Sequence, residues 1–371
     1  FRTLDLWVRD LAAQARVVER LCLLAPGGRA ASPADLPVPE GIRVLTHADV
    51  AAAGGIDALV REHDVVQINS GMPWKTARWM FRGARAARKN DRCLVLGVSS
   101  NRATTTVMNA QRGSWLRRVK ARLISRQILD VQTRLAKLAD GVYLVGHGLA
   151  LVSPHANTHI GTASWITAAD VIAAADLGRR MEDRLRAPFL KLCVAGRLEF
   201  MKGTHLAIEA LRRLRDRGDG RCPRLTILGE GPERAALQEL VDGHGLADRV
   251  TFGGTFEYPT AFHRELGRHD LLLLTNLNDE QPRVVFDAAS QGVLPVCPDT
   301  APYRALGVDA DLRYERGLRR PPARPPRNGV AWRRCRSSEA GPPCAWICDA
   351  IVGRLWRGSG GGGEGFERDL G

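Results

Sequence analysis

The stretch LLLLTNLNDEQPRVVFDAASQGVLPVC (residues 271–297) contains two strand patterns with a helix pattern between them. Its ends, LLLLT (271–275) and VLPVC (293–297), are short apolar runs typical of buried parallel strands. Between them a polar loop leads into a short helix, for which Pro282 is a suitable start and Gly292 a suitable end. The stretch therefore predicts a strand–helix–strand unit of a parallel α/β sheet.

Two carboxylates, Asp279 and Asp287, flank the start of this helix. If all eight steps between them were helical, the two residues would be about 12 Å apart and within about 80° of the same face. A helix start also leaves backbone N–H groups unpaired, and its dipole favours a bound anion. Residues 276–292 are thus expected to grip a long ligand with a phosphate in its middle and hydroxyl groups at both ends.

The same alternation of strand and helix extends upstream from this stretch. Strands are expected at residues 191–195, 224–228, 249–252, 271–275, 293–297 and 312–314, and helices at 204–217, 232–242 and 260–268. This alternation is typical of a doubly wound parallel sheet with helices on both faces. Residues 191–315 are therefore predicted to form one complete domain of this kind.

A similar series occupies residues 1–170. Strands are expected at 20–26, 42–46, 65–69, 93–99 and 141–146, and helices near the start and at 74–88 and 123–138. Because such a sheet normally begins with a strand and a glycine-rich turn, we expect the chain to be truncated at its start. Residues 171–190 are helical and polar and are predicted to form the passage between the two domains.

The character of the sequence changes after Tyr314. Residues 316–371 are rich in Pro, Gly and Arg and lose all periodicity, yet they hold three of the eight Trp and three of the eight Cys. Disordered linkers tend to use Ser, Glu and Lys instead. The mixture indicates a gene read in the wrong frame, and a genuine flexible, disordered tail is the alternative.

Composition excludes several classes of protein. No run approaches the roughly 18 apolar residues that span a bilayer, and the start lacks a signal-peptide pattern, so we expect a cytoplasmic protein. The cysteines are scattered and indicate reduced thiols.

The formal charge is +14, but the eleven Arg and five acidic residues of 316–371 account for +6 of it. Since no nucleic-acid-binding motif accompanies the rest, no nucleic acid is expected as a partner.

Two basic residues follow the first strand of the second series. The motif GRLEFMKG runs from Gly196 to Gly203 and places Arg197 and Lys202 beyond the carboxyl end of that strand, where ligands bind in open α/β sheets. Arg holds phosphate through paired hydrogen bonds, Lys acts as a point charge, and glycine lets the backbone approach closely. Alone, the motif is explained as well by solvated loop charges. The motif is better evidence for a phosphate site because residues 276–292 are expected at the same sheet edge.

Four motifs in order, GRLEFMKG, LGEGPER, VTFGGTF and DEQPRVVFDAASQGVLPV, resemble the C-terminal domain of family 4 (group 1) glycosyltransferases. The resemblance implies the GT-B fold, in which two doubly wound Rossmann-like domains face a cleft, with the acceptor on residues 1–170 and the nucleotide-sugar on 191–315. It implies retaining transfer of a hexosyl group from a UDP- or GDP-sugar to a glycan, lipid-linked or small-molecule acceptor, in polysaccharide or cell-envelope biosynthesis. Neither a metal nor another cofactor is implied.

The resemblance also assigns roles to residues. The family's basic pair, which contacts the donor pyrophosphate, falls on Arg197 and Lys202. Its paired acids, Glu-x7-Glu, fall on Asp279 and Asp287, both shortened to Asp. The first acid faces the donor sugar and the second holds the ribose hydroxyls. Glu280 is one position away, so a register shift that gives it the first role stays open.

The helix start completes the implied donor site, with backbone N–H groups of Val284 and Val285 and with Arg283 beside them. Asp279, Arg197 and Lys202 form the implied catalytic set. An acid shortened by one methylene withdraws its carboxylate by about 1.5 Å, a distance that matters when geometry sets the rate. The shortening leaves the donor identity and the efficiency open.

Histidines give weaker signals. Many family members place a His near the reacting carbon, whereas this chain has SSNR at residues 99–102. His147 is a second candidate, although a loop histidine without a partner is more often structural. His155 and His159 have the spacing of a metal-binding pair on a helix, but their surroundings indicate a strand and no third ligand is evident. No metal site is expected.

The stretch RGSWLRRVKARLISRQ (residues 112–127) is strongly basic. On a helix, its apolar residues cluster and its basic residues surround them: Trp115, Leu116, Val119 and Leu123, and Arg117, Arg118, Lys120 and Arg122. Two interpretations are equally good. The helix makes peripheral contact with the anionic inner face of the cell membrane, or it is an ordinary core-facing helix with a solvated basic side. A lipid-linked acceptor would favour the first.

Two other functions stay open. A GT-B nucleotide-sugar epimerase would share the donor pocket and need no acceptor. An inactive GT-B fragment that binds nucleotide-sugar would fit the expected truncation and the irregular tail.

Overall fold

The computed structural model describes residues 2–3, 5–25, 36–111, 113–150, 154–162, 164–217 and 223–314. Within them the chain forms two compact units. Unit 1 comprises the described residues of 1–103, 122–145 and 150–161, and unit 2 those of 104–121, 146–149 and 162–371. The predicted irregular tail, residues 316–371, lies outside the described residues.

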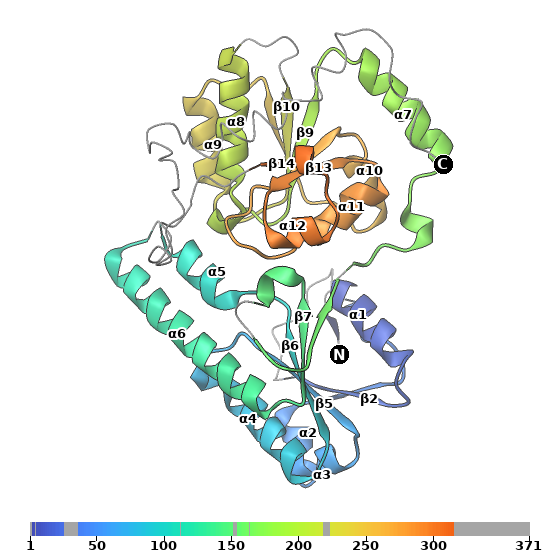
Figure 1. The fold of residues 1–371 in the computed structure, drawn as a ribbon, viewed down its shortest axis with the longest axis vertical. Coiled ribbons are helices and arrows are strands. Elements are labelled where there is room, and N and C mark those ends of the chain that lie inside the picture. Colours follow the sequence, from blue (N-terminus) through green and yellow to red (C-terminus); the bar gives the residue numbers. More distant parts are fainter. Residues whose placement is uncertain are drawn as a thin grey trace, which may run out of the picture. The chain divides into compact units, whose positions relative to one another are not determined.

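Unit 2 is built on a six-stranded sheet in the order β11-β10-β9-β12-β13-β14, and every neighbouring pair is parallel (Figure 1). The strands are β9 (Lys191–Ala195), β10 (Arg224–Leu228), β11 (Val250–Gly254), β12 (Leu271–Leu273), β13 (Leu294–Pro298) and β14 (Arg313–Tyr314). The first strand in the chain, β9, lies at the centre. Successive strands are added first on one side of it and then on the other, which is the doubly wound order.

Helices cover both faces of this sheet. They are α7 (Ala174–Arg186), α8 (Thr204–Arg217), α9 (Arg234–Gly243), α10 (Thr260–Leu266), α11 (Val284–Ser290) and α12 (Ala301–Ala305). Side chains of β9 alternate between two buried clusters: Leu192 and Val194 pack with α8 and α9, and Cys193 packs with α10 and α11. Because both faces are covered, the strands are continuous apolar runs in the sequence.

Two arginines of α7 fasten that helix to unit 2. Arg180 donates to the carbonyl oxygens of Gly267, at 2.7 Å, and Gln291. Arg184 donates to His269 O at 2.6 Å and forms an ion pair of 2.8 Å with Asp270. Arginine near the C-terminal ends of α10 and α11 also complements their dipoles. The helix therefore packs as part of unit 2.

Unit 1 contains a four-stranded parallel sheet in the order β5-β6-β7-β8 and two smaller two-stranded sheets. The four strands are β5 (Val65–Asn69), β6 (Cys93–Val98), β7 (Gly141–Val145) and β8 (Thr158–Gly161). The smaller sheets pair β2 (Leu21–Leu24) with β4 (Ile42–Leu45), and β1 (Arg2–Thr3) with β3 (Leu36–Pro37).

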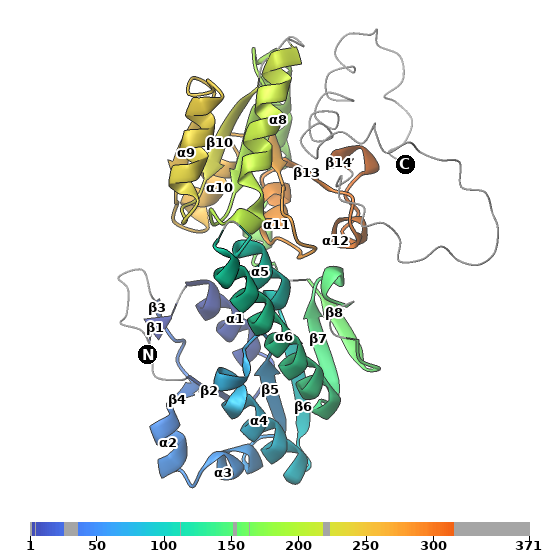
Figure 2. The same ribbon diagram turned by 90° about the vertical axis from the view of Figure 1, so that its left-hand side faces the viewer.

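The helices between residues 5 and 138 differ greatly in length. They are α1 (Asp5–Ala15), α2 (His47–Ala52), α3 (Ile56–Arg61), α4 (Trp74–Lys89), α5 (Arg102–Asn109) and α6 (Trp115–Leu138). α5 from Thr104 onward and α6 up to Ala121 belong to unit 2. Figures 1 and 2 both show α4 and α6 side by side. Since they join strands added in the same direction by right-handed crossovers, both cover one face of the sheet.

The doubly wound parallel fold predicted from the sequence is confirmed, and all of the expected strands are present. Three differences concern helices. The helix expected at 123–138 begins earlier, at Trp115, and the short helices α2, α3, α5 and α12 were not predicted. The helix expected from Pro282 begins two residues later, at Val284, and Gly292 follows its end with φ +60° as expected.

Candidate functional site

The candidate site lies at the point where the strand order of unit 2 changes direction. β10 pairs with one side of β9 and β12 with the other. In open α/β sheets a ligand binds in the crevice outside the carboxyl ends of the strands at such a switch point. The loops that follow β9 and β12 are those that carry the predicted basic and acidic residues.

The two loops are bonded to each other. Leu277 N–H donates to Met201 O at 2.8 Å, and the Thr275 hydroxyl donates to Lys202 O at 2.9 Å. Gly203 has φ +68°, and a Cβ on it would overlap the carbonyl oxygen of Thr275. Only glycine therefore permits this approach. The structure thus brings together the two segments that the sequence placed at one sheet edge.

Gly196 marks the open side of the loop after β9. Its φ is +138°, and its N–H donates to Leu228 O at 2.9 Å. Among the described residues, no heavy atom lies within 4 Å of the position that a Cβ would take. Gly229 packs against the Gly196 carbonyl, and Leu198 N–H donates to Glu230 O at 2.9 Å. The LGEG motif therefore supports the loop, while Gly196 leaves space in front of it.

The predicted basic pair occupies two different surroundings. Arg197 has a side chain that is 74% exposed and an ion pair of 3.0 Å with Glu199. Lys202 is half-buried at the end of the single turn η3 (Phe200–Lys202). Glu199 offsets part of the positive charge of Arg197. Lys202 is the less exposed cation of the pair.

Two buried polar groups lie beside this pair. The side-chain amide nitrogen of Asn276 and the hydroxyl of Thr204 have no hydrogen-bond partner among the described residues, although both residues are less than 7% exposed. An unsatisfied buried polar group costs about 1–3 kcal/mol, so such groups usually have a water or ligand partner. Thr204 follows Gly203 in the chain, and Asn276 follows Thr275, whose hydroxyl donates to Lys202 O. Their position points to a polar ligand at this edge.

The acidic residues are distributed between loop and helix. Asp279 is exposed and Glu280 half-buried in the loop before α11, whereas Asp287 is buried within α11. The eight steps between Asp279 and Asp287 are therefore not all helical, and the spacing expected for a continuous helix does not apply. Val285 N–H, one of the two predicted donor contacts, donates to Pro282 O at 3.3 Å in this structure.

Asp287 is held by two partners that the sequence did not reveal. Its Oδ1 lies 2.9 Å from Nε2 of His263 and accepts a hydrogen bond of 3.1 Å from the Tyr258 hydroxyl. His263 is only 6% exposed, in α10. The sequence gives only a weak signal for this role of His263, which precedes Leu266 by three positions on a helix. A histidine with a purely structural place in the core has the same sequence pattern.

Arg283, predicted to bind the donor, stacks on an aromatic ring. Its guanidinium carbon lies 3.8 Å from the ring centre of Trp165, and that ring meets Tyr258 edge-on at 6.1 Å. Arginine is well suited to this cation–π stacking. Trp165 thus joins Arg283 to the group around Asp287, which links the start and the middle of α11.

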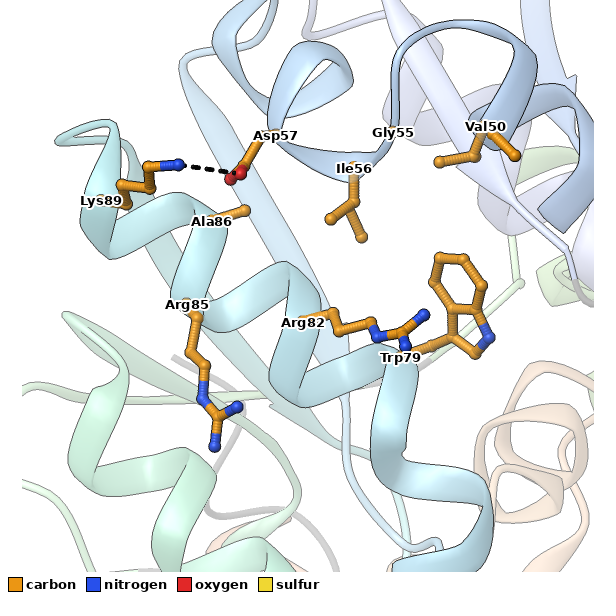
Figure 3. Close-up of a pocket in the computed structure, with 10 residues that line it drawn as sticks. Val50, Gly55, Ile56, Asp57, Trp79, Arg82, Arg85, Ala86 and Lys89 are labelled. Atoms are coloured by element: carbon orange, nitrogen blue, oxygen red, sulfur yellow. Dashed lines mark hydrogen bonds and ion pairs between the residues drawn. The ribbon is translucent and has the colours of Figure 1, made fainter.

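A separate cavity of about 480 Å³ lies in unit 1, between α2, α3 and α4 (Figure 3). Ile56, Trp79 and Arg82 point toward one another there, while Arg85 points away. Lys89 and Asp57 form an ion pair of 3.0 Å at one end. None of the predicted site residues lines this cavity.

The histidines considered from the sequence are dispersed. His147 is exposed at the start of η1 (His147–Leu149), and His159 stacks on Tyr143 in the neighbouring strand, at 5.6 Å. His155 contacts Asn157 O at 3.0 Å. Within the part of the chain that the structure describes, no three His, Cys, Asp or Glu side chains are grouped so as to hold a metal ion. Nor does any helix there have the length and apolar character needed to cross a bilayer.

Comparison with known proteins agrees with this arrangement. Residues 183–311, which include both loops, match the model of the family "Glycosyl transferases group 1". No curated protein matches the chain. The resemblance inferred from the four motifs is therefore confirmed for this segment at the level of group 1.

Solved structures establish the fold. Sucrose-phosphate synthase from Thermosynechococcus elongatus is 14% identical with a TM-score of 0.60, covering 94% of this chain and 83% of its own. Anabaena HepE in complex with UDP is 18% identical with a TM-score of 0.52, covering 74% and 71%. WaaG, a glycosyltransferase involved in lipopolysaccharide biosynthesis, is 15% identical with a TM-score of 0.52, covering 82% and 80%. The chain has the GT-B fold of these proteins, as predicted.

Proposed function

We propose that this protein is a retaining family 4 glycosyltransferase that moves a hexosyl group from a nucleoside-diphosphate sugar to a glycan, lipid-linked or small-molecule acceptor. The observation that carries the proposal is the pair of bonded loops at the switch point of unit 2, one basic and one acidic. Their place within the segment that matches group 1 glycosyltransferases supports the same reaction. HepE has been crystallised with UDP and with UDP-glucose, which favours a UDP-linked donor.

The proposed chemistry is stabilisation of the leaving group. Arg197 and Lys202 neutralise the charge that develops on the departing diphosphate, and preorganised charges of this kind are usually the largest catalytic effect. The Thr204 hydroxyl and the Asn276 amide nitrogen, which have no hydrogen-bond partner among the described residues, provide polar contacts beside Lys202. No metal is needed in this scheme, since the basic side chains supply the positive charge.

Asp287 is assigned to the ribose of the donor. His263 and Tyr258 hold it through Oδ1, so we assign Oδ2 to the ribose hydroxyls. Asp279 is assigned to the donor sugar, and Glu280 is the competing residue for that role. Arg283, Val284 and Val285 complete the proposed donor site together with Gly196 and Gly203.

The test is release of nucleoside diphosphate by the full chain from UDP- and GDP-sugars, with and without a mixture of glycan and lipid-linked acceptors. Lys202→Ala is expected to lower turnover at least tenfold, because it removes a charge from the diphosphate contact. Lys191→Ala is the matched control, since Lys191 is exposed at the opposite end of β9. Near-normal transfer by Lys202→Ala would refute the assignment.

Product analysis separates the alternatives. Retention predicts that the new linkage keeps the anomeric configuration of the donor, which NMR of the product reports. A sugar whose configuration changes in the presence of donor alone would indicate an epimerase. Binding of UDP without turnover by any donor would indicate an inactive chain. We propose that the protein acts in the cytoplasm, with nucleotide-sugars as its substrates.

A further inference from the structure

The first half of α6 exposes a stripe of large apolar side chains. Trp115, Leu116, Val119 and Leu123 have exposed fractions of 65%, 62%, 42% and 53%. Isolated exposed apolar residues are ordinary, but a contiguous group marks an interaction surface. We call these four residues the α6 stripe.

The α6 stripe lies away from the face by which the helix packs. The buried residues of α6 include Ala121, Ile128, Val131 and Leu135, each at most 6% exposed. With about 100° of rotation per residue, the centre of the stripe is about 150° from the centre of this buried group. An ordinary core-facing helix therefore does not explain the stripe, because other residues of α6 face the core.

The surroundings of the stripe are basic. Arg118, Lys120, Arg122 and Arg126 are exposed around it. The sequence of α6 contains no acidic residue before Asp130, whose carboxylate accepts hydrogen bonds of 3.0 Å from Trp74 and from Arg134.

The neighbouring helix α4 lies along the second half of α6, since its Trp74 and Arg88 contact Asp130 and Asp140. The positive charge around the stripe therefore comes from the exposed basic residues of α6 itself. A partner that matches this surface must combine negative charge with an apolar layer. An anionic lipid bilayer has both, whereas a nucleic acid would leave the leucine and valine side chains in water.

We propose that the α6 stripe inserts into the surface of an anionic phospholipid bilayer, with the surrounding arginine and lysine side chains at the headgroup phosphates. Amphipathic helices of this kind lie in the plane of the interface, with the apolar face about 5–10 Å deep. Tryptophan favours this depth because its ring has an apolar body and a polar N–H. The proposal does not depend on the proposed transfer activity, since membrane binding needs no donor.

The experiment measures sedimentation of the full chain with vesicles of phosphatidylcholine alone and of phosphatidylcholine mixed with phosphatidylglycerol. We expect binding to the anionic vesicles and little to the neutral ones. Trp115→Ser/Leu123→Ser is expected to lower the partition coefficient at least tenfold. Met181→Ser is its control, because Met181 is 56% exposed in α7, outside the stripe. Thermal unfolding checks that each variant folds, as expected for exposed positions.

Charge is tested separately with two lysines of the same helix. Lys120→Glu is expected to weaken binding to anionic vesicles by more than the roughly fivefold effect of one lost basic residue. Lys137→Glu makes the same change about 25 Å further along α6 and is expected to have little effect.

Three results would overturn the proposal. They are unchanged binding of Trp115→Ser/Leu123→Ser, equal binding of the wild type to neutral and anionic vesicles, and binding to duplex DNA that is as tight as binding to vesicles.

Discussion

Asp287 has a structural role as well as a proposed role in the donor site. Its carboxylate is the acceptor for the buried His263 and the half-buried Tyr258. Asp287→Ala removes the acceptor that both donors use, which costs about 1–3 kcal/mol for a buried polar group such as His263. We therefore expect a lower unfolding temperature together with weaker donor binding.

Tyr258→Phe is the matched comparison for Asp287→Ala. It removes one donor and keeps the carboxylate and its bond to His263, so donor affinity is expected to change only a few-fold. Thermal unfolding and calorimetric titration with UDP measure the two effects. An Asp287→Ala variant as stable as the wild type would contradict the structural role.

Asp279 and Glu280 compete for the donor sugar. We expect Asp279→Asn to lower turnover at least tenfold, because a neutral amide cannot stabilise positive charge that develops at the reacting carbon. Glu280→Gln serves as the control, with the same loss of charge one position away, and is expected to have the smaller effect. Initial rates with saturating donor measure the turnover of both variants. A larger loss of turnover in Glu280→Gln would assign the role to Glu280.

His269 makes stability depend on pH. Burial lowers the pKa of this imidazole below its ordinary value of 6.5, and hydrogen bonds to backbone carbonyls oppose the shift only in part. Below about pH 6.5 the unfolded chain therefore binds a proton that the folded chain resists, so the free energy of unfolding falls as the pH falls. We expect His269→Gln to reduce this fall in urea titrations from pH 7.5 to 5.5. An identical slope in both proteins would contradict the assignment.

At the scale of elements, the contact between the two loops depends on Gly203. Gly203→Ala forces a Cβ into the Thr275 carbonyl at a positive φ, so we expect a lower unfolding temperature and weaker UDP binding. Gly196→Ala is the matched control for the unfolding temperature, with a positive φ but open space around the added methyl. Its stability should fall only by the conformational strain of about 1–3 kcal/mol. A Gly203→Ala variant no less stable than Gly196→Ala would show that the contact is unimportant.

The sequence predicted an element well wherever the residues of that element determine its secondary structure. Runs such as LLLLT at 271–275 predict strands because they are buried on both faces. The start of α11 was placed two residues early, because Pro282 suits a helix start but its carbonyl instead takes part in a turn with Val285.

Contacts between elements were harder to predict. The sequence of α6 shows an apolar cluster and basic residues, yet only packing reveals that Ala121 and Ile128, not Trp115 and Leu123, face the core. His263 was missed for the same reason, since its partner Asp287 is 24 positions away.

At the scale of the whole molecule, the two units differ in what they offer a ligand. Unit 2 contains every residue assigned to the donor and the segment that matches group 1 glycosyltransferases. Unit 1 contains the cavity at Trp79 and the basic helix α4. Donor recognition is therefore expected to be a property of unit 2.

The most direct test of this account is calorimetric titration of the full chain with UDP and with GDP, for the wild type, Lys202→Ala and Lys191→Ala. The account predicts one site per chain for at least one of the two nucleotides. It predicts at least about tenfold weaker binding in Lys202→Ala, as for loss of a charged hydrogen bond of about 1.5–3 kcal/mol, and unchanged binding in Lys191→Ala. Failure of the wild type to bind either nucleotide, or equal affinity in Lys202→Ala, would contradict it.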